Sequence, residues 1–438
     1  MIPTIEYKLD DWMINMQSAS GSSIDVDILA KRINAMWIID WILAFVFAIL
    51  PILQHYKGLF SDASASSMLV VLISPLIILK IVSKKRIWVI PLIPLALYSF
   101  YLSLIHGLDL FTLGREALLL VFFIAALNEG IDTQRMLRIS VKIAVLACVC
   151  EIVQYLSYYI FGMHIQMVPT GMLLDTAEQW IQLAQTGRIS VTGSIMKIYR
   201  PSAFFLEPSH LAIYCTPALA ITLLSGKNNK RKMISAIIIT LGILLSTSGL
   251  GIGVVTLLWS VYGLFYFDKN IEHKKIELRD IFQPRSIIFV SIFFIIFVVL
   301  YSTVGVFRSS VNRIFIGTGG KSAIQGRTTT GIRSLQMLSG RNLLIGMGDA
   351  MSIADWTMPG FFYNMFKYGL VGCLLSYIFY FKSLFILRRG HFWFTVIVII
   401  FSFFTVHTFA AFYRMYYIIM ILHGYKMYSP KKRLIRLR

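Results

Sequence analysis

The segment RPSAFFLEPSHLAIY, residues Arg200 to Tyr214, joins a long polar stretch to an apolar one. Proline is favoured at the first position of a helix, so the sequence predicts a helix that begins at Pro208, with Glu207 at its cap. Glu207 and His210 then share the first turn. A carboxylate and an imidazole can move protons, and a nearby arginine can hold a phosphate. The candidate catalytic residues are therefore Arg200, Glu207 and His210, and the segment suggests chemistry on a lipid-linked anionic substrate.

Apolar residues dominate the rest of the chain. Of its 438 residues, 57% are hydrophobic, and the mean hydropathy is +0.73. Apolar runs repeatedly reach about 17–22 residues, the length of a membrane-spanning helix. We therefore expect an all-α, polytopic helical membrane protein with about twelve transmembrane helices, forming a single integral membrane domain over residues 1–438. The expected spans are 36–53, 67–83, 87–105, 113–128, 139–161, 204–225, 233–248, 250–267, 286–304, 359–381, 392–408 and 409–425. Two of the connections are tight hairpins, near Ser246–Gly251 and His407–Ala411, and a re-entrant pair of helices is the alternative for each.

Charge gives an expected orientation. Lysine and arginine gather in alternate connections and in the tail, whereas the short connections near Lys57 and Asp109 are nearly free of them. Cytoplasmic loops carry such an excess, so both termini are expected in the cytoplasm. The net charge of +20 then reflects topology and anionic lipid headgroups, and no nucleic-acid module is recognisable. The N-terminal segment shows no basic stretch followed by an apolar one, so we expect no cleaved signal peptide.

Two long segments, 162–203 and 305–358, are expected to be large loops on the outer face. The first contains GMLLDTAEQWIQLAQTGR, whose apolar residues recur at helical spacing, as in a helix lying on a bilayer or on the protein itself. The second concentrates cations that can grip phosphate in a bidentate fork. These are Arg308, Arg313, Lys321, Arg327, Arg333 and Arg341.

No residue pattern points to a metal or a nucleotide. The four cysteines, Cys148, Cys150, Cys215 and Cys373, have neither metal nor disulfide spacing and are interpreted as small buried apolar residues. HExxH, P-loop and DxD-like patterns are also missing from the sequence. We expect no metal and no cofactor. Glu151 is a functional candidate because it is ionisable within a span, but a structural pair with Gln154 is preferred, and Asp40 is likewise interpreted as structural.

Several segments resemble one family. RPSAFFLEPSHLAIY resembles the R…EPS–H/F–A segment of bacterial polysaccharide polymerases of the O-antigen polymerase (Wzy) type. LLSTSGLGIGVVTLL resembles the small-residue span that follows, and GRTTTGIRSLQMLSGRNLLIGMGDA resembles the family's G-R-x…L…G-x-G loop. PGFFYNMFKYGLVGCLLSYIFY and HTFAAFYRMYY resemble its next span and its last hairpin. The resemblance covers about residues 140–425 in order.

This resemblance implies a GT-C-like, metal-independent membrane glycosyltransferase in the bacterial cytoplasmic (inner) membrane, with its active site facing the periplasm. It implies that an oligosaccharide chain leaves undecaprenyl diphosphate and is joined to a lipid-linked repeat unit, in the biosynthesis of O-antigen or capsule. The expected partners are undecaprenyl-diphosphate-linked oligosaccharides and membrane lipid. A chain-length regulator and a flippase are further partners that it suggests.

The chemistry of glycosyl transfer gives each candidate residue an expected role. Glycosyl transfer from a diphosphate requires a base for the acceptor hydroxyl and cations for the leaving group. Glu207 or His210 is the expected base, and His407 lies near the same outer end. The expected diphosphate-binding residues are Arg327, Arg333, Arg313, Arg341 and Arg414.

Three other functions stay open. An O-antigen ligase would use a similar scaffold with a different acceptor. A flippase or transporter of lipid-linked oligosaccharide would line its middle with polar groups, and Glu151 is the residue that favours it. A scaffold protein without catalysis would tolerate substitution of the outer arginines.

Overall fold

The protein is helical throughout the part that the computed structural model describes. That part contains no named strand, only isolated bridges between Tyr56 and Leu173 and between Lys57 and Ser64. It comprises residues 26–59, 64–82, 93–105, 130–167, 171–174, 201–224, 229–266, 284–303, 323–348, 359–386, 389–404, 412–413 and 416–421, with isolated positions between 114 and 125 and between 305 and 316.

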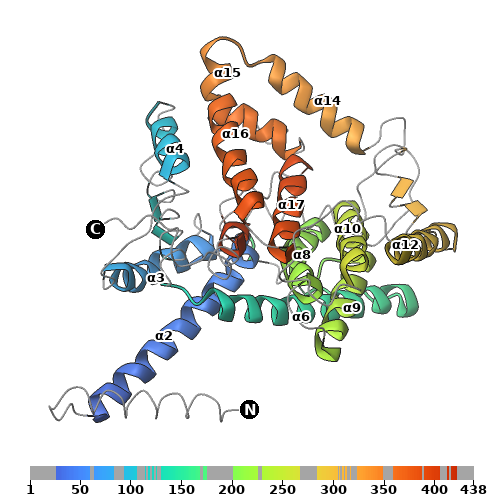
Figure 1. The fold of residues 1–438 in the computed structure, drawn as a ribbon, viewed down its shortest axis with the longest axis horizontal. Helices are drawn as coiled ribbons and strands as arrows, with labels where there is room; N and C mark the ends of the chain where they lie inside the picture. Colours follow the sequence, from blue (N-terminus) through green and yellow to red (C-terminus); the bar gives the residue numbers. More distant parts are fainter. Residues whose placement is uncertain are drawn as a thin grey trace.

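The helices follow one another in the order shown by the colours of Figure 1. The first half of the chain contains α2 (Val26–Leu53), α3 (Ala65–Val82), α4 (Ile93–Ile105), α6 (Thr133–Phe161) and α8 (Pro208–Leu224). The second half contains α9 (Lys230–Leu245), α10 (Gly249–Tyr266), α12 (Pro284–Thr303), α14 (Ala323–Gln336), α15 (Arg341–Ile345), α16 (Gly360–Ile386) and α17 (Arg389–Phe404).

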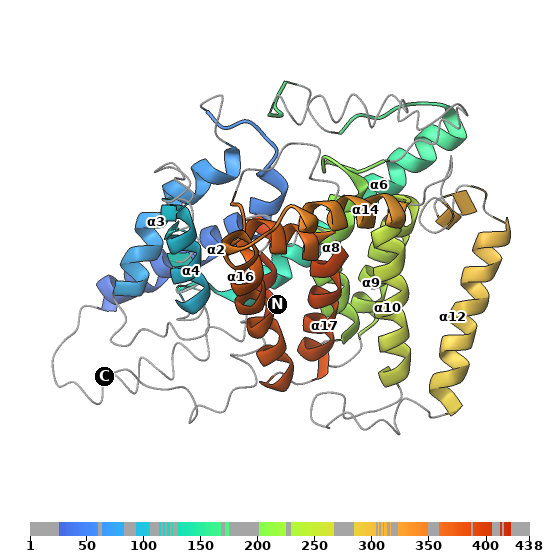
Figure 2. The same cartoon turned by 90° about the horizontal axis from the view of Figure 1, so that it is seen from above.

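Helix α8 is the centre of the molecule. It begins at Pro208, which confirms the predicted start, and 15 of its 17 residues are buried. It packs against α6, α9, α10 and α17, which surround it in Figures 1 and 2. A helix that is apolar on all sides is stable only when neighbours cover all of its faces. The first turn of α8 therefore lies at one end of the protein's main core.

Small residues allow the helices around α8 to approach closely. A Cβ atom on Gly242 of α9 would lie 2.4 Å from the Cβ of Cys148 on α6, so only glycine fits there. The predicted hairpin at Ser246–Gly251 is confirmed, because α9 ends at Leu245 and α10 begins at Gly249. Cys148, Cys215 and Cys373 are buried and Cys150 is partly buried, as expected of small apolar residues.

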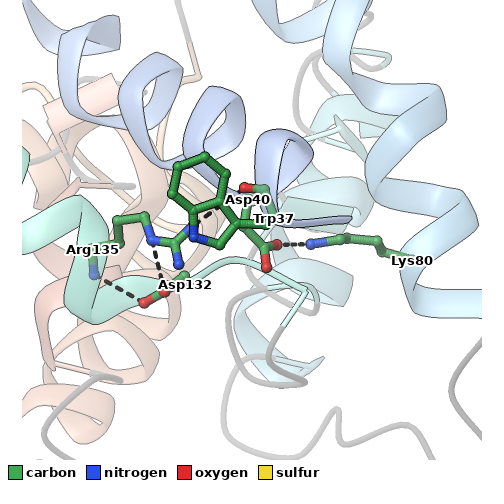
Figure 3. Close-up of polar contacts among 5 residues, drawn as sticks. All are labelled: Trp37, Asp40, Lys80, Asp132 and Arg135. Atoms are coloured by element: carbon green, nitrogen blue, oxygen red, sulfur yellow. Dashed lines mark hydrogen bonds and ion pairs between the residues drawn. The ribbon is translucent and has the colours of Figure 1, made fainter. Parts of the chain in front are cut away.

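An ion pair and a cation–π contact connect α2 to its neighbours (Figure 3). Asp40 on α2 pairs with Lys80 on α3, which confirms the structural interpretation of Asp40. Asp132 caps α6 by accepting a hydrogen bond from the Arg135 backbone N–H, and its carboxylate also pairs with the Arg135 side chain at 3.2 Å. The Arg135 guanidinium lies 5.6 Å from the ring centroid of Trp37 on α2, which adds a cation–π contact.

The expectation of about twelve transmembrane helices is wrong for the described residues. Over the part of the chain that the structure describes, no helix combines the length and the apolar character needed to cross a membrane. Within the described residues, three expected spans correspond to α4, α9 and α17, which have 13, 16 and 16 residues, fewer than the roughly 17–25 that a span requires. Gly369, with non-helical backbone angles, divides α16 into two shorter helices. A run of apolar residues predicts burial of that segment, but it does not predict at which residue a helix ends.

Candidate functional site

Three segments that are distant in the sequence meet at the N-terminal end of α8: the turn after α2, the end of α6 with the residues that follow it, and the residues just before α8. The Tyr56 hydroxyl donates a hydrogen bond of 2.8 Å to the Phe204 carbonyl, and the Leu174 N–H donates one of 3.0 Å to the His55 carbonyl. Gln154 of α6, which is 4% exposed, accepts a bond from the Ala203 N–H at 2.8 Å and donates one to the Ile165 carbonyl at 2.9 Å. These bonds fix the turn that leads into the first residue of α8.

Tyr56 is partly buried and Gln154 is buried, and both side chains hydrogen-bond to the backbone of the loop before α8 or of neighbouring segments. Burial raises the pKa of the Tyr56 phenol from its ordinary value of 10.0 to about 12, because the charged form would lose solvent. Gln154 uses both ends of its amide on loop backbone, so the expected pairing of Gln154 with Glu151 is not the contact that the structure gives it. Glu151 itself is fully buried in α6. A backbone turn can be held rigidly only when its polar groups are satisfied in this way.

Glu207 and Ser209 form the polar entrance to α8. The Glu207 side chain is partly buried, and its Oε2 accepts a hydrogen bond of 2.8 Å from the Ser209 hydroxyl. The Glu207 carbonyl accepts bonds from the backbone N–H groups of His210 at 3.0 Å and Leu211 at 3.2 Å. Glu207 therefore occupies the predicted cap position, and the hydrogen bond from Ser209 orients its carboxylate.

His210 lies one turn further in, almost completely buried at 2% exposure. Its ring is stacked on the ring of His55, with centroids 4.8 Å apart and planes only 4° from parallel. The Nε2 atom of His55 is 2.9 Å from the Gln54 side-chain amide nitrogen. The structure thus brings a second imidazole to the first turn of α8, from the turn that follows α2.

Tyr413 closes the other side of His210. Its ring centroid lies 6.0 Å from that of His210, and its hydroxyl donates a hydrogen bond of 3.3 Å to the His210 carbonyl. Burial raises the pKa of the Tyr413 phenol well above its usual range, and the Glu207 carboxylate adds to the shift in the same direction. The carboxylate, two imidazoles and a phenol are therefore neighbours at one end of α8. We define this group, Glu207, Ser209, His210, His55 and Tyr413, as the α8 entrance site.

The predicted diphosphate-binding arginines are only partly described. Arg333 is exposed in the last turn of α14, and Arg341 is exposed at the start of α15. Both residues lie on helices that pack against α16, and neither belongs to the α8 entrance site. Arg327 lies on α14, but its side chain is outside the described residues. Arg200, Arg313, Arg414 and His407 also lie outside the described residues, as does most of the predicted loop 162–203.

The segment after Arg341 is built around a close backbone contact with α16. The Met347 N–H donates a hydrogen bond of 2.8 Å to the Phe366 carbonyl, and the Gly348 N–H donates one of 3.1 Å to the Lys367 carbonyl. Gly346 and Gly369 both have positive φ, 77° and 66°. The broken turn of α16 thus supplies carbonyls that hold the end of residues 323–348, which carry Arg327, Arg333 and Arg341 and which we call the arginine-bearing segment.

Sequence reasoning missed His55 and Tyr413. His55 lies in the short connection after α2, which contributed to the sequence analysis only through its low content of lysine and arginine. No spacing rule links His55 to His210. Tyr413 lies in a stretch rich in aromatic residues, which resembles ordinary core sequence. A histidine directly after an apolar run was the one available signal. Within the described residues, no group of three or more His, Cys, Asp or Glu side chains is arranged to hold a metal ion.

Comparison of the chain with known family models, with curated proteins and with solved structures finds no match.

Proposed function

We propose that this protein is a glycosyltransferase that extends a bacterial surface polysaccharide. It transfers an oligosaccharide chain from undecaprenyl diphosphate to a hydroxyl of a lipid-linked repeat unit. The observation that carries the proposal is the α8 entrance site, where a carboxylate that accepts a hydrogen bond precedes α8 and a buried, stacked imidazole follows it in the first turn. The resemblance of the segments around Glu207 and Gly331 to polysaccharide polymerases supports the same activity.

The reaction needs one proton acceptor. The acceptor hydroxyl oxygen forms a bond to the anomeric carbon, and its proton passes to Glu207 or His210. The bond between that carbon and the diphosphate oxygen breaks, and undecaprenyl diphosphate leaves with the electron pair. A positioned base typically contributes about 10²–10⁴-fold to such a rate. The hydrogen bond from Ser209 holds the Glu207 carboxylate in one orientation, which suits this task.

The leaving diphosphate needs positive charge. Exposed arginines match phosphate oxygens in a fork and stay charged at all relevant pH values. Arg333 and Arg341 are exposed and meet this requirement, and Arg327 shares the helix of Arg333. We assign the recognition of the diphosphate to this arginine-bearing segment.

A lipid-linked substrate requires contact with a membrane. Large apolar side chains are exposed on several helices, including Trp37 at 49%, Leu72 at 67% and Phe294 at 65%. Exposed apolar surface of this kind marks sites of contact with protein or lipid. This surface supports a location at the bacterial cytoplasmic membrane, where the lipid-linked donor and acceptor reside.

The proposal is tested by replacing Glu207 with glutamine in the host and running its surface polysaccharide on a gel. Glutamine keeps the shape and accepts the Ser209 hydrogen bond, but it is a far weaker base. We expect the ladder to collapse to a single repeat unit. Asp132→Asn is the matched control, because asparagine retains helix capping and lies on a different element. The control should give the normal ladder, and equal amounts of both variants in the membrane fraction exclude loss of the protein.

A host without the gene distinguishes the other functions, through its lipid-linked intermediates. Long chains left on undecaprenyl diphosphate would identify a ligase. Single units trapped on the cytoplasmic side would identify a flippase. Normal polymer from Glu207→Gln would refute the catalytic role assigned to that residue.

A further inference from the structure

His55 is the one residue of the α8 entrance site that comes from the other end of the chain. We propose that His55 is a positioning residue for His210, and that protonation of one ring of the stacked pair strongly disfavours protonation of the other. The proposal rests on the 4.8 Å separation and the 4° angle between the ring planes. Its catalytic consequence rests on the proposed function, whereas the coupling of the two rings does not.

The geometry explains the positioning. An imidazole on a helix can turn about two side-chain bonds, and a parallel ring against its face removes that freedom. The His55 ring is itself restrained, because its Nε2 lies 2.9 Å from the Gln54 amide nitrogen, and its carbonyl accepts a bond from the Leu174 N–H. These contacts hold the His55 ring in place, and the stacked His55 ring in turn restrains the ring of His210.

The geometry also explains the limit on charge. Two imidazolium rings stacked at this distance in a buried place would repel each other strongly, so protonation of one disfavours protonation of the other. A pair of this kind keeps one lone pair available while it stores one proton. That is the property required of a base that must take a proton from an acceptor hydroxyl.

Other ionisable groups lie on the segments that surround the pair. Glu207 lies before α8, and Tyr413 lies against the His210 ring. Tyr56 and Lys57 follow His55 in the chain, and α6, which packs on α8, carries the buried Glu151. Since Glu151 is a second buried group that can influence His210, the test includes Glu151→Gln to separate the effect of this carboxylate from that of His55.

The experiment follows the histidine ring signals of the full-length protein by nuclear magnetic resonance as the pH is changed, in detergent micelles. His210→Phe assigns the His210 signal among the eight histidines. In the natural protein we expect His210 and His55 to titrate in two separated steps. In His55→Phe, which keeps a flat ring for stacking, His210 should titrate in a single step at higher pH. His55→Gln should give the same shift, and it serves if the phenylalanine variant does not fold.

The matched control is His164→Phe. His164 is exposed, and its ring lies against Tyr158 rather than against another histidine, at 4.6 Å. This variant should leave the His210 titration unchanged. An unchanged His210 titration in both His55 variants, or the same shift in His164→Phe, would overturn the proposal. Loss of the two separated steps in Glu151→Gln but not in the His55 variants would overturn it too, because the carboxylate would then be the coupled partner.

The catalytic consequence has its own readout. The acid side of the pH profile of chain elongation should move to higher pH in His55→Phe, so that the rate falls several-fold more in mildly acidic buffer than at neutral pH. A uniform fall at every pH would indicate a purely structural role and would contradict the proposal. Coupled titration in a protein that extends no polysaccharide would leave the pairing intact and would refute the proposed function.

Discussion

At the scale of single residues, Pro208 determines where the site begins. Its ring fixes φ near the helical value and its missing N–H is not needed at a first position, so α8 starts there with Glu207 as the preceding residue. The helical period then brings His210 to the same turn. This local part of the site was predictable, because it depends only on neighbours in the sequence. His55 and Tyr413 were not, since their contacts with His210 depend on packing between distant segments.

The role of the exposed arginines gives a residue-scale prediction. Arg333→Ala or Arg341→Ala should raise the apparent KM for the lipid-linked donor about tenfold, the loss expected for one charge-assisted hydrogen bond to phosphate. The melting temperature should stay the same, because both side chains are exposed. Kinetic measurement of elongation checks this. Arg231→Ala, also exposed but on α9, is the control, and an equal rise in that variant would show that the effect is not specific.

Tyr56 gives a prediction about pH. Its pKa is raised from 10.0 to about 12 in the folded protein. The stabilising effect of the neutral phenol is therefore complete below about pH 10, and stability falls as the pH rises towards 12, since the unfolded chain releases its proton first. Tyr56→Phe should lack this fall, and at neutral pH it should lose about 1 kcal/mol from the missing hydrogen bond. Thermal unfolding at a series of pH values measures both effects. Tyr101→Phe, an exposed position, should behave as the natural protein does.

At the scale of elements, the arginine-bearing segment depends on the break in α16. The backbone at Gly369 is non-helical, and just before it the carbonyls of Phe366 and Lys367 accept hydrogen bonds from the N–H groups of Met347 and Gly348. Tyr98 of α4 also donates a hydrogen bond of 2.8 Å, to the Tyr368 carbonyl. The glycines of the segment were visible in the sequence. Their partner was not, because a window of apolar residues around Gly369 resembles one continuous helix.

Glycine substitutions test this contact. A Cβ on Gly346 would lie 2.4 Å from the Lys367 carbonyl oxygen, and one on Gly369 would lie 2.3 Å from the Leu344 carbonyl oxygen. Both positions also have positive φ, so alanine adds strain of about 1–3 kcal/mol. Gly346→Ala and Gly369→Ala should each lower the melting temperature. Gly326→Ala has open space in α14 and should raise it slightly. The same melting temperature for all three variants would contradict the described contact.

At the scale of the whole molecule, composition predicted the helical class correctly and the transmembrane count wrongly. The all-α class follows from long apolar runs with few strand signals, and the described residues are helical. Over the described residues, an apolar run need not coincide with an uninterrupted helix, as the break at Gly369 in α16 illustrates. The orientation derived from charge is not tested by these helices and stays a prediction. Many of the apolar side chains are not buried in the core. They form exposed apolar surface on helices such as α2, α3 and α12.

That surface gives a whole-molecule prediction. If apolar contact holds the protein at a membrane, it should stay with the membrane fraction after washing at high salt, because salt screens charges but strengthens apolar association. Release by detergent alone is the expected result. Release by salt would show that the positive net charge, and not the apolar surface, provides the attachment.

The most direct test of the account is a reconstitution of the purified protein in liposomes with an undecaprenyl-diphosphate-linked repeat unit as both donor and acceptor. Products are separated by size and weighed by mass spectrometry. The account predicts a ladder of lipid-linked chains from the natural protein, and only the starting unit from Glu207→Gln. Chains of equal length from both proteins, or no extension by the natural protein with authentic substrate, would contradict it.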